Sequence, residues 1–218
     1  MRWLVLQIGD SAFPTGGFAH SAGLEAIAHL GGTSSESLGD FACAHLWSVG
    51  SSSLPFVAAA HDAPSDVWRL DAELDAFLTH HVANRASRTQ GRAFVATCGR
   101  VFESGPIADM ASPARARKVA AHLAPIFGAI LSVLHVDRRE ALELFLYLTL
   151  RNLTSAAVRL GLVGPHEAQR IHRTHERTLD DVLATCSDIK PTDAASTAPI
   201  ADLMAATHDR LYTRIFQS

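Results

Sequence analysis

Residues 138–162 read RREALELFLYLTLRNLTSAAVRLGL, and apolar side chains recur in this run every three or four positions. That spacing places Leu142, Phe145 and Leu153 along one face of a helix. Leu148 adds an apolar group on another side, so the helix is apolar over most of its circumference. Such a helix is usually central in a bundle, so we expect an all-α fold arranged around it.

Residues that favour helix ends flank this run. Asp137 and Glu140 form a capping-box pattern at its start, and Gly164 marks its end. Pro165 fits the first turn of a following helix, which we expect to continue to about Cys186.

The remaining sequence is also helical in pattern, and no alternating strand pattern of any length is present. Further helices are expected over 18–30, from Ser34 or Ser35 to about 49, over 71–101 with a candidate interruption near Gly91, from Ser112 with a kink or split at Pro125, and over 200–212. Pro55 predicts a break or kink. We therefore expect one all-α domain, residues 1–218, built as a bundle of roughly eight to ten helices.

The charge balance argues against a nucleic-acid partner. The chain has 19 Lys and Arg residues and 22 Asp and Glu residues, a formal net charge of −3. This leaves little positive field to attract a phosphate backbone. All the cations except Lys118 and Lys190 are arginines, which suit contacts with carboxylates at protein interfaces.

Cysteine usage and the longest uncharged run indicate a cytoplasmic protein outside the membrane. Cys43, Cys98 and Cys186 are odd in number and lack metal-site spacing, which favours a reducing compartment. The apolar stretch near the N-terminus is too short for a signal peptide. Residues 119–136 carry no charge, but polar groups such as His122 weaken membrane insertion, so a buried helix is expected.

Patterns typical of enzymes are scarce. The chain has no phosphate-binding loop with its lysine, and no Gly-x-Ser-x-Gly elbow. His172 and His175 lie three residues apart and could share a metal with a carboxylate such as Glu176, which would make the chain an all-α metal-dependent hydrolase. The other interpretation is that these histidines have structural roles, because a stable site needs three or four convergent ligands.

Residues 10–25, DSAFPTGGFAHSAGLE, form the most unusual stretch. Pro14 with Gly16 and Gly17 predicts a sharp loop, and small polar residues surround it. The loop is either a connector with helix caps or a rigid recognition element, and the residue types alone allow both.

This stretch closely resembles the opening of the urease accessory protein UreF family. The similarity continues in order along the chain, and together its segments form a specific set. The matching segments are LPFV at 54–57, ASRTQG at 86–91, APIFG at 124–128, LRNLTSAAVRL at 150–160 and HDRLYTRIFQS at 208–218.

The resemblance implies an all-α protein that forms a homodimer and has no catalytic residues of its own. Members bind UreD, also called UreH, and the pair recruits the GTPase UreG to apo-urease. No cofactor is expected to stay bound: nickel would be in transit, and GTP would sit on UreG. The family's role is to assemble the complex that delivers nickel and to modulate GTP hydrolysis by UreG.

The resemblance also implies three sets of partner-binding candidates. Those for UreG or the nickel path are Asp10, Ser11, Pro14, Gly16, Gly17, His20, Ser21 and Glu25. Asp10, His20 and Glu25 are the candidates for transient nickel contacts. Those for UreD lie in a C-terminal interaction tail at about 210–218 and are Arg210, Tyr212, Arg214, Ile215 and Phe216. Secondary candidates are Arg85, Ser87, Gln90 and Gly91.

Two alternatives stay open for these sets. The tail could instead dock on its own bundle, because C-terminal segments do so in many proteins. On the apolar helix, Arg151, Asn152 and Arg159 must be paired if they are buried, which favours a role in the fold over a partner contact.

Overall fold

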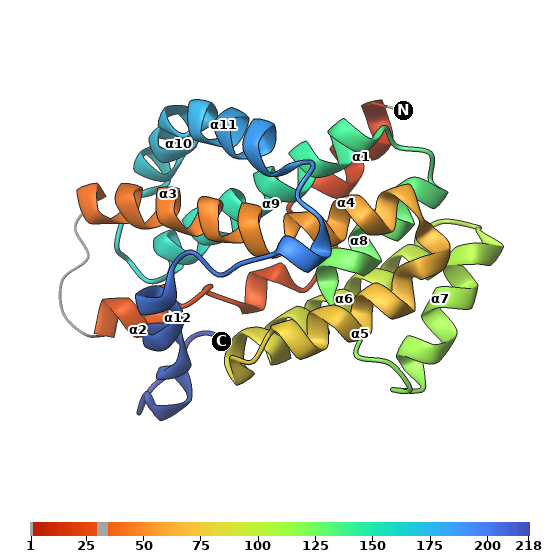
Figure 1. Cartoon of the computed structure of the whole chain (residues 1–218). Coiled ribbons are helices and arrows are strands. Elements are labelled where there is room, and N and C mark those ends of the chain that lie inside the picture. Colours follow the sequence, from red (N-terminus) through yellow and green to blue (C-terminus); the bar gives the residue numbers. More distant parts are fainter. Residues whose placement is uncertain (1, 30–34) are drawn as a thin grey trace.

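The computed structural model describes residues 2–29 and 35–218, and this part of the chain contains twelve α-helices, four short 3₁₀ helices and no strand (Figure 1). The α-helices are α1 (Arg2–Gly9), α2 (Leu24–His29), α3 (Ser35–Ser52), α4 (Leu54–Asp62), α5 (Val67–Phe77), α6 (His81–Val101), α7 (Gly105–Arg115), α8 (Leu123–Val133), α9 (Arg138–Arg159), α10 (Pro165–Thr174), α11 (Glu176–Cys186) and α12 (Pro199–Ala206). The 3₁₀ helices are η1 (Gly17–Ala19), η2 (Pro64–Asp66), η3 (Pro191–Asp193) and η4 (His208–Arg210). The all-α class is confirmed, with more helices than the roughly eight to ten expected.

Helix α9 is central, as its apolar pattern predicted. The Asp137 side chain caps it by accepting hydrogen bonds from the main-chain N–H of Arg139 at 2.9 Å and of Glu140 at 3.3 Å. Buried side chains such as Leu142 and Leu153 lie along its length. It packs against α1, α3, α4, α8, α10 and α11, so most of its circumference is covered by other helices.

Helices α4 and α8 form the tightest pair in the bundle. At Gly128 of α8 an added Cβ would lie 2.1 Å from the Val57 carbonyl oxygen of α4, so the two backbones are in direct contact. Helix α8 lies within the uncharged run 119–136 and is buried along most of its length, as expected. Among the described helices none is both long and apolar enough to cross a membrane.

A row of aromatic rings connects helices that line the cavity described below. Phe94 of α6 stacks on Phe127 of α8 with ring centroids 5.1 Å apart. Phe127 in turn meets Phe145 of α9 edge to face at 5.3 Å. Phe13, from the loop after α1, packs on Phe94 at 6.3 Å, so the opening loop is attached to the core through this row.

The expected helix over 71–101 is in fact two helices, and the break is not at Gly91. Helix α5 ends at Phe77 and α6 starts at His81, whose preceding residue His80 caps it by accepting from the Val82 N–H at 3.1 Å. The Asn84 side chain bridges the break by donating to the Leu78 carbonyl at 3.1 Å. Periodicity misses such a break because the apolar spacing continues on both sides of it.

Other helix boundaries also differ from expectation, although Pro55 does lie in the first turn of α4 after a break. The helix expected to end at Cys186 is split at His175 into α10 and α11. Helix α7 starts at Gly105, so Pro113 lies near its end and does not open it. The helix expected from Ser112 is split, as Pro125 predicted: α7 ends at Arg115, and α8 begins at Leu123 with Pro125 in its first turn, where the missing N–H costs nothing. The expected end at Leu30 and the cap at Ser34 lie outside the described residues.

Candidate functional site

The opening loop, residues 10–25, divides into an outer and an inner half. Asp10, Ser11 and Pro14 are exposed, and the Asp10 carboxylate accepts from the Ala12 N–H at 2.6 Å, which fixes a turn. The inner half turns into the bundle: Gly16 is half-buried, and the later candidates are buried. These buried candidates are Gly17, His20, Ser21 and Glu25.

The C-terminal segment, residues 207–218, docks against this inner half. The main-chain N–H of Ser21 donates to the Ser218 carbonyl at 2.6 Å, and that of Gln217 donates to the Ala19 carbonyl at 2.8 Å. The His20 Nδ1 and the Ser218 hydroxyl are 2.5 Å apart. Two segments from opposite ends of the sequence therefore make one site.

The Glu25 side chain anchors the C-terminal segment through hydrogen bonds to its main chain. Its side chain is fully buried, and its two carboxylate oxygens accept from the main-chain N–H groups of Ile215 at 2.6 Å and Phe216 at 3.2 Å. The buried His208 donates to the same carboxylate through Nε2 at 2.8 Å. Three hydrogen-bond donors to one buried carboxylate offset the free-energy cost of its desolvation. They also occupy both of its oxygens, so the carboxylate is engaged by the tail.

Arg159 of α9 joins the two segments on the outside. Its guanidinium lies over the Phe18 ring at 3.6 Å from the centroid and over the Phe216 ring at 4.2 Å, and it donates to the Phe18 carbonyl. Arg151 donates to the Gly9 carbonyl at 2.5 Å and to the Asn152 side chain at 3.3 Å. The expectation that the polar residues of this helix are paired within the fold is therefore confirmed.

These contacts bear on one member of the predicted UreD set, Phe216. Phe216 is buried by its own chain, as in the alternative of docking in cis, so it is not presented to a partner in this conformation. Tyr212 is fully exposed and Ile215 is 59% exposed, and Arg210 and Arg214 are exposed beside them. The outer side of the tail therefore still presents an aromatic, an aliphatic and two cationic groups.

The secondary candidates lie on α6 and differ in role. Arg85 makes a two-pronged ion pair with Asp209, with N–O distances of 2.7 and 3.0 Å, and so connects α6 to the tail. Gly91 allows α6 to touch the segment before α8, because a Cβ there would lie 2.0 Å from the Ala121 carbonyl oxygen. Gln90 lines the cavity described below.

Ser87 belongs to a buried network around His122. The His122 ring lies 3.0 Å from the Ser87 hydroxyl through Nδ1 and 2.9 Å from Asp75 through Nε2. Asp71, also buried, accepts from the main-chain N–H groups of Ala121 at 2.9 Å and His122 at 2.6 Å. Burial lowers the pKa of His122 although Asp75 opposes the shift. The network fixes the start of α8 on α5 and α6.

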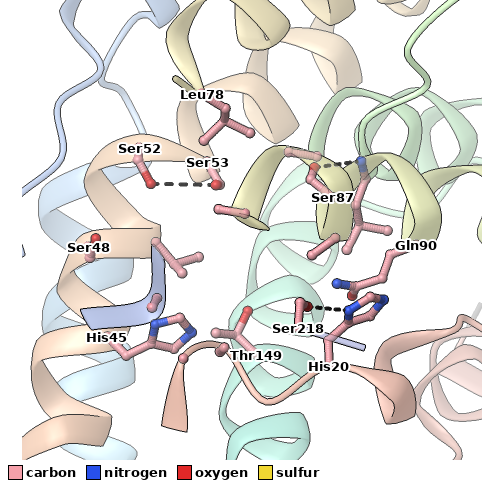
Figure 2. A pocket seen from close by; sticks show the side chains of 18 of the residues that line it. His20, His45, Ser48, Ser52, Ser53, Leu78, Ser87, Gln90, Thr149 and Ser218 are labelled. Carbon is pink, nitrogen blue, oxygen red and sulfur yellow. Dashed lines mark hydrogen bonds between the residues drawn. The ribbon is translucent and has the colours of Figure 1, made fainter. Parts of the chain in front are cut away.

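A cavity of about 370 Å³ lies between α3, α6, α8, α9, α12 and the C-terminal residue (Figure 2). Figure 2 shows His45 on one side of it, His20 with Ser218 on the other, and hydroxyl groups such as that of Thr149 along its wall. The rest of the lining is mostly apolar and includes Phe127. It is therefore a largely apolar chamber with a few polar groups.

Two of the three imidazoles that line this cavity, those of His20 and His45, are neutral at pH 7. Burial lowers the pKa of His20 to about 4, with smaller contributions from Arg85 and His208. Burial also lowers the pKa of His45 to about 4, although Asp202 opposes the shift. The Nε2 of His20 has no hydrogen-bond partner within the described residues, and the neutral form can act as a ligand through it.

The described part of the chain brings no three His, Cys, Asp or Glu side chains together in a way that could hold a metal ion. Glu25 is engaged by the tail and Asp10 lies in the outer half of the loop, so the nickel candidates do not form one group.

The histidine pair considered for a hydrolase is used for packing. The His172 Nε2 lies 2.9 Å from the Thr154 hydroxyl. The His175 ring bridges the carbonyls of Ile171 at 2.7 Å and Gly39 at 2.9 Å. The two rings are directed to different partners, so the structure does not support the metal-dependent alternative.

Sequence reasoning did not single out four residues of this site, which are His45, Asp71, His122 and His208. His208 lies in the C-terminal match HDRLYTRIFQS, and its pairing with Glu25 could have been suspected because the opening stretch and this match both carry titratable groups. Asp71 and His122 gave no signal, because they lie 51 residues apart and belong to no matching segment. His45 gave none either, because Asp202, the charge that acts on it, is distant in sequence.

Comparison with known proteins finds relatives that are similar along the whole chain. The family model for UreF matches residues 32–175. Urease accessory protein F of Arabidopsis thaliana is 36% identical over 223 residues, covering 100% of this chain and 93% of the relative. The protein of the same name from Oryza sativa subsp. indica is 33% identical over 98% of this chain and 84% of its own length. Urease accessory protein UreF of Paenarthrobacter aurescens is 30% identical over 97% and 96%. With both ends of the chain meeting in one site, and with relatives that match it from end to end, this chain belongs to the UreF family of urease accessory proteins.

Proposed function

We propose that this chain acts in urease maturation as a scaffold that, together with UreD (UreH), recruits the GTPase UreG and apo-urease for GTP-dependent insertion of nickel. The single observation that carries the proposal is the end-to-end similarity to urease accessory proteins, at up to 36% identity. A homodimer and a modulating effect on GTP hydrolysis by UreG are parts of the same proposal, and they rest on the family alone. A cytoplasmic location is also part of it and rests on the cysteine usage.

The tail supports the proposed contact with UreD. Its inner side is held by Glu25, while Tyr212 and Ile215 point outward. Exposed aromatic and aliphatic groups beside arginines are typical of the centre of a protein interface. The outer half of the opening loop, with Asp10 and Ser11 exposed, is the surface we assign to UreG.

The cavity supports a role for this chain in the nickel path. Nickel is cargo here, so its contacts must be few and exchangeable. A neutral imidazole with a free nitrogen is a suitable transient ligand, and His20 offers one that is held in place through its other nitrogen. Glu25 is the weakest of the earlier candidates because its oxygens are occupied by three donors.

Reconstitution tests the whole proposal. Purified chain is mixed with UreD, UreG, GTP, nickel and apo-urease, and urease activity is followed over time. Activation that depends on the chain supports the proposal, and equal activation in its absence contradicts it.

A second experiment tests the tail surface and leaves the docking in cis intact. Tyr212→Ala with Ile215→Ala removes the two exposed side chains but keeps the main-chain donors to Glu25. We expect this pair to lose co-purification with UreD, as deletion of residues 210–218 should. Leu6→Ala with Tyr147→Ala, an exposed pair elsewhere, is the control. Retention of UreD by both pairs and by the deletion would disprove the assignment.

A further inference from the structure

A groove of about 440 Å³ follows the outer side of α6 next to the turn that separates it from α5. It is lined by Leu78, Thr79 and Asn84 at one end and by Arg85, Arg88 and Arg92 along its length. The three arginines follow one another at intervals of three and four residues, so they share one face of the helix. None of them took part in the cavity described above.

Most of the cationic side chains in and beside this groove have no carboxylate that pairs with them alone. Arg85 is paired with Asp209, but Arg88 reaches only Asp75, at 3.8 Å, and that carboxylate already accepts from His122 and Asn84. In the described residues Arg92 forms no ion pair; it donates weakly to the Val119 carbonyl at 3.5 Å.

The buried Nε of Arg92 has no hydrogen-bond partner in the same part of the chain. Arg117 and Lys118 are exposed, and neither makes an ion pair with a described residue.

The cations also repel one another. The pKa of Arg92 is lowered, first by burial and then by the positive charges of Arg88 and Arg117, and Asp71 only partly opposes this. Arg117 is therefore close enough to belong to the same positive region. Such a concentration of unpaired charge contrasts with the net charge of −3 of the whole chain. It is costly to the isolated fold and is relieved when an anion binds.

We propose that this groove binds a carboxylate-rich segment of a partner protein. From Arg85 to Arg92 the row extends about 10 Å along the helix axis, which is the length of about three residues of extended peptide. Guanidinium groups bind carboxylates in a two-pronged geometry, and charge complementarity of this kind also speeds association. A row of this length suits several carboxylates in sequence better than one small anion. The proposal does not depend on the role in urease maturation.

The test measures binding of a fluorescein-labelled peptide, Glu-Glu-Ala-Glu-Glu-Ala-Glu-Glu, to the full chain by fluorescence anisotropy at low salt. The variant Arg88→Gln with Arg92→Gln and Arg117→Gln should bind the peptide about tenfold more weakly, since exposed pairs contribute modestly and add up over three. The matched control is Arg139→Gln with Arg170→Gln and Arg173→Gln, which changes the net charge equally but removes arginines that have partners on their own helices or the next.

Each outcome decides the matter. Selective loss in the groove variant, with binding that weakens as salt rises, supports the proposal. Equal loss in the control variant, no binding at all, or equal binding of the peptide with Gln in place of Glu would overturn it. Displacement of the peptide by inorganic phosphate or GTP at lower concentration than by unlabelled peptide would overturn it too, in favour of a phosphate ligand. If the triple variant does not fold, Arg88→Gln alone, which removes one arginine of the groove, answers the same question, with Arg139→Gln alone as its control.

Discussion

Gly91 is a residue of a family motif whose identity is explained by packing. The helix α6 passes so close to the segment before α8 that a methyl group at this position would collide with main-chain atoms of Ala121, His122 and Leu123, at 2.0 to 2.7 Å. Main-chain atoms cannot rotate away as a flexible side chain can. The Gly in ASRTQG is therefore explained by packing, whereas the arginines beside it are free to serve binding.

We predict that Gly91→Ala lowers the free energy of unfolding by about 3 kcal/mol, the upper range for overpacking. Gly99→Ala on the same helix is the matched control, because its new Cβ would meet only Ala111 Cβ at 3.5 Å, an ordinary contact. That change should stabilise the chain by about 0.5–1 kcal/mol through helix propensity. Urea unfolding of the two variants measures both effects, and similar stabilities would contradict the argument.

The cavity histidines predict a pH dependence of stability. In the folded chain the pKa of His20 and that of His45 are about 4, against 6.5 for an ordinary imidazole. Between these values the unfolded chain binds more protons than the folded chain. The free energy of unfolding therefore falls as the pH drops from about 6.5 towards 4, by up to about 1.4 kcal/mol per pH unit for each group, and this contribution is fully present above 6.5.

Urea unfolding at a series of pH values checks this expectation. His45→Gln should reduce the slope between pH 6.5 and 4, because one of the imidazoles with a lowered pKa is gone. His166→Gln, which removes an exposed imidazole on α10, should leave the slope as in the unmodified chain. A slope that is the same in all three proteins would show that His45 is not held neutral.

At the scale of elements, the inner side of the tail depends on one carboxylate of α2. Glu25→Gln keeps the size of the side chain but turns one acceptor oxygen into a donor that faces N–H groups. Hydrogen bonds to a buried charge are worth about 2–3 kcal/mol, so we expect a loss of that size in the free energy of unfolding. The tail should also become open to cleavage by trypsin at Arg210 and Arg214.

Urea unfolding and limited proteolysis measure the two effects. Glu176→Gln, at an exposed ion pair with Arg173, is the control and should change neither. Unchanged trypsin resistance of the tail in Glu25→Gln would mean that contacts such as that of Phe216 with Arg159 hold the tail without the carboxylate.

Some elements were predictable from sequence and others were not, for physical reasons. Helix α9 was predictable because its apolar spacing and its Asp137 cap are both local in the sequence. The split at His175 carries none, because it is stabilised by a bond to the Gly39 carbonyl of a distant helix. Pro113 was predicted to open a helix but lies near the end of α7, since proline is found both in the first turn of helices and where they end.

The candidate site was predictable only in its parts. The loop at 10–25 and the tail at 208–218 were both singled out, yet nothing in either segment says that they meet, because 183 residues separate Glu25 from His208. Burial of Phe216 against Arg159 follows from that meeting and not from local pattern. Contacts between distant segments are the information that a single sequence does not contain.

At the scale of the whole molecule, stability is unevenly distributed. Helices α4 and α8 are in backbone contact and almost completely buried. Helix α12 has an exposed Leu203, and the segment after it is anchored by the buried Phe216 and His208. Regions with few buried apolar contacts open at lower free energy than the core.

Hydrogen–deuterium exchange of the full chain should show this difference. We predict that peptides from α12 and 207–218 exchange well before those from α4, α8 and α9. Glu25→Gln should speed exchange at 207–218 and at 20–25 together, and leave α4 and α8 unchanged. Uniform acceleration across all helices would mean that the chain opens only as one unit.

The bond from Glu25 to the main chain of Ile215 and Phe216 also bears on the order of events at the ribosome. Glu25 leaves the ribosome long before its hydrogen-bond donors exist, because the N–H groups that satisfy it are translated some 190 residues later. The opening loop at 10–25 is thus synthesised early but acquires its full set of hydrogen bonds late. In nascent chains that stop short of residue 215 the Glu25 carboxylate lacks these main-chain donors.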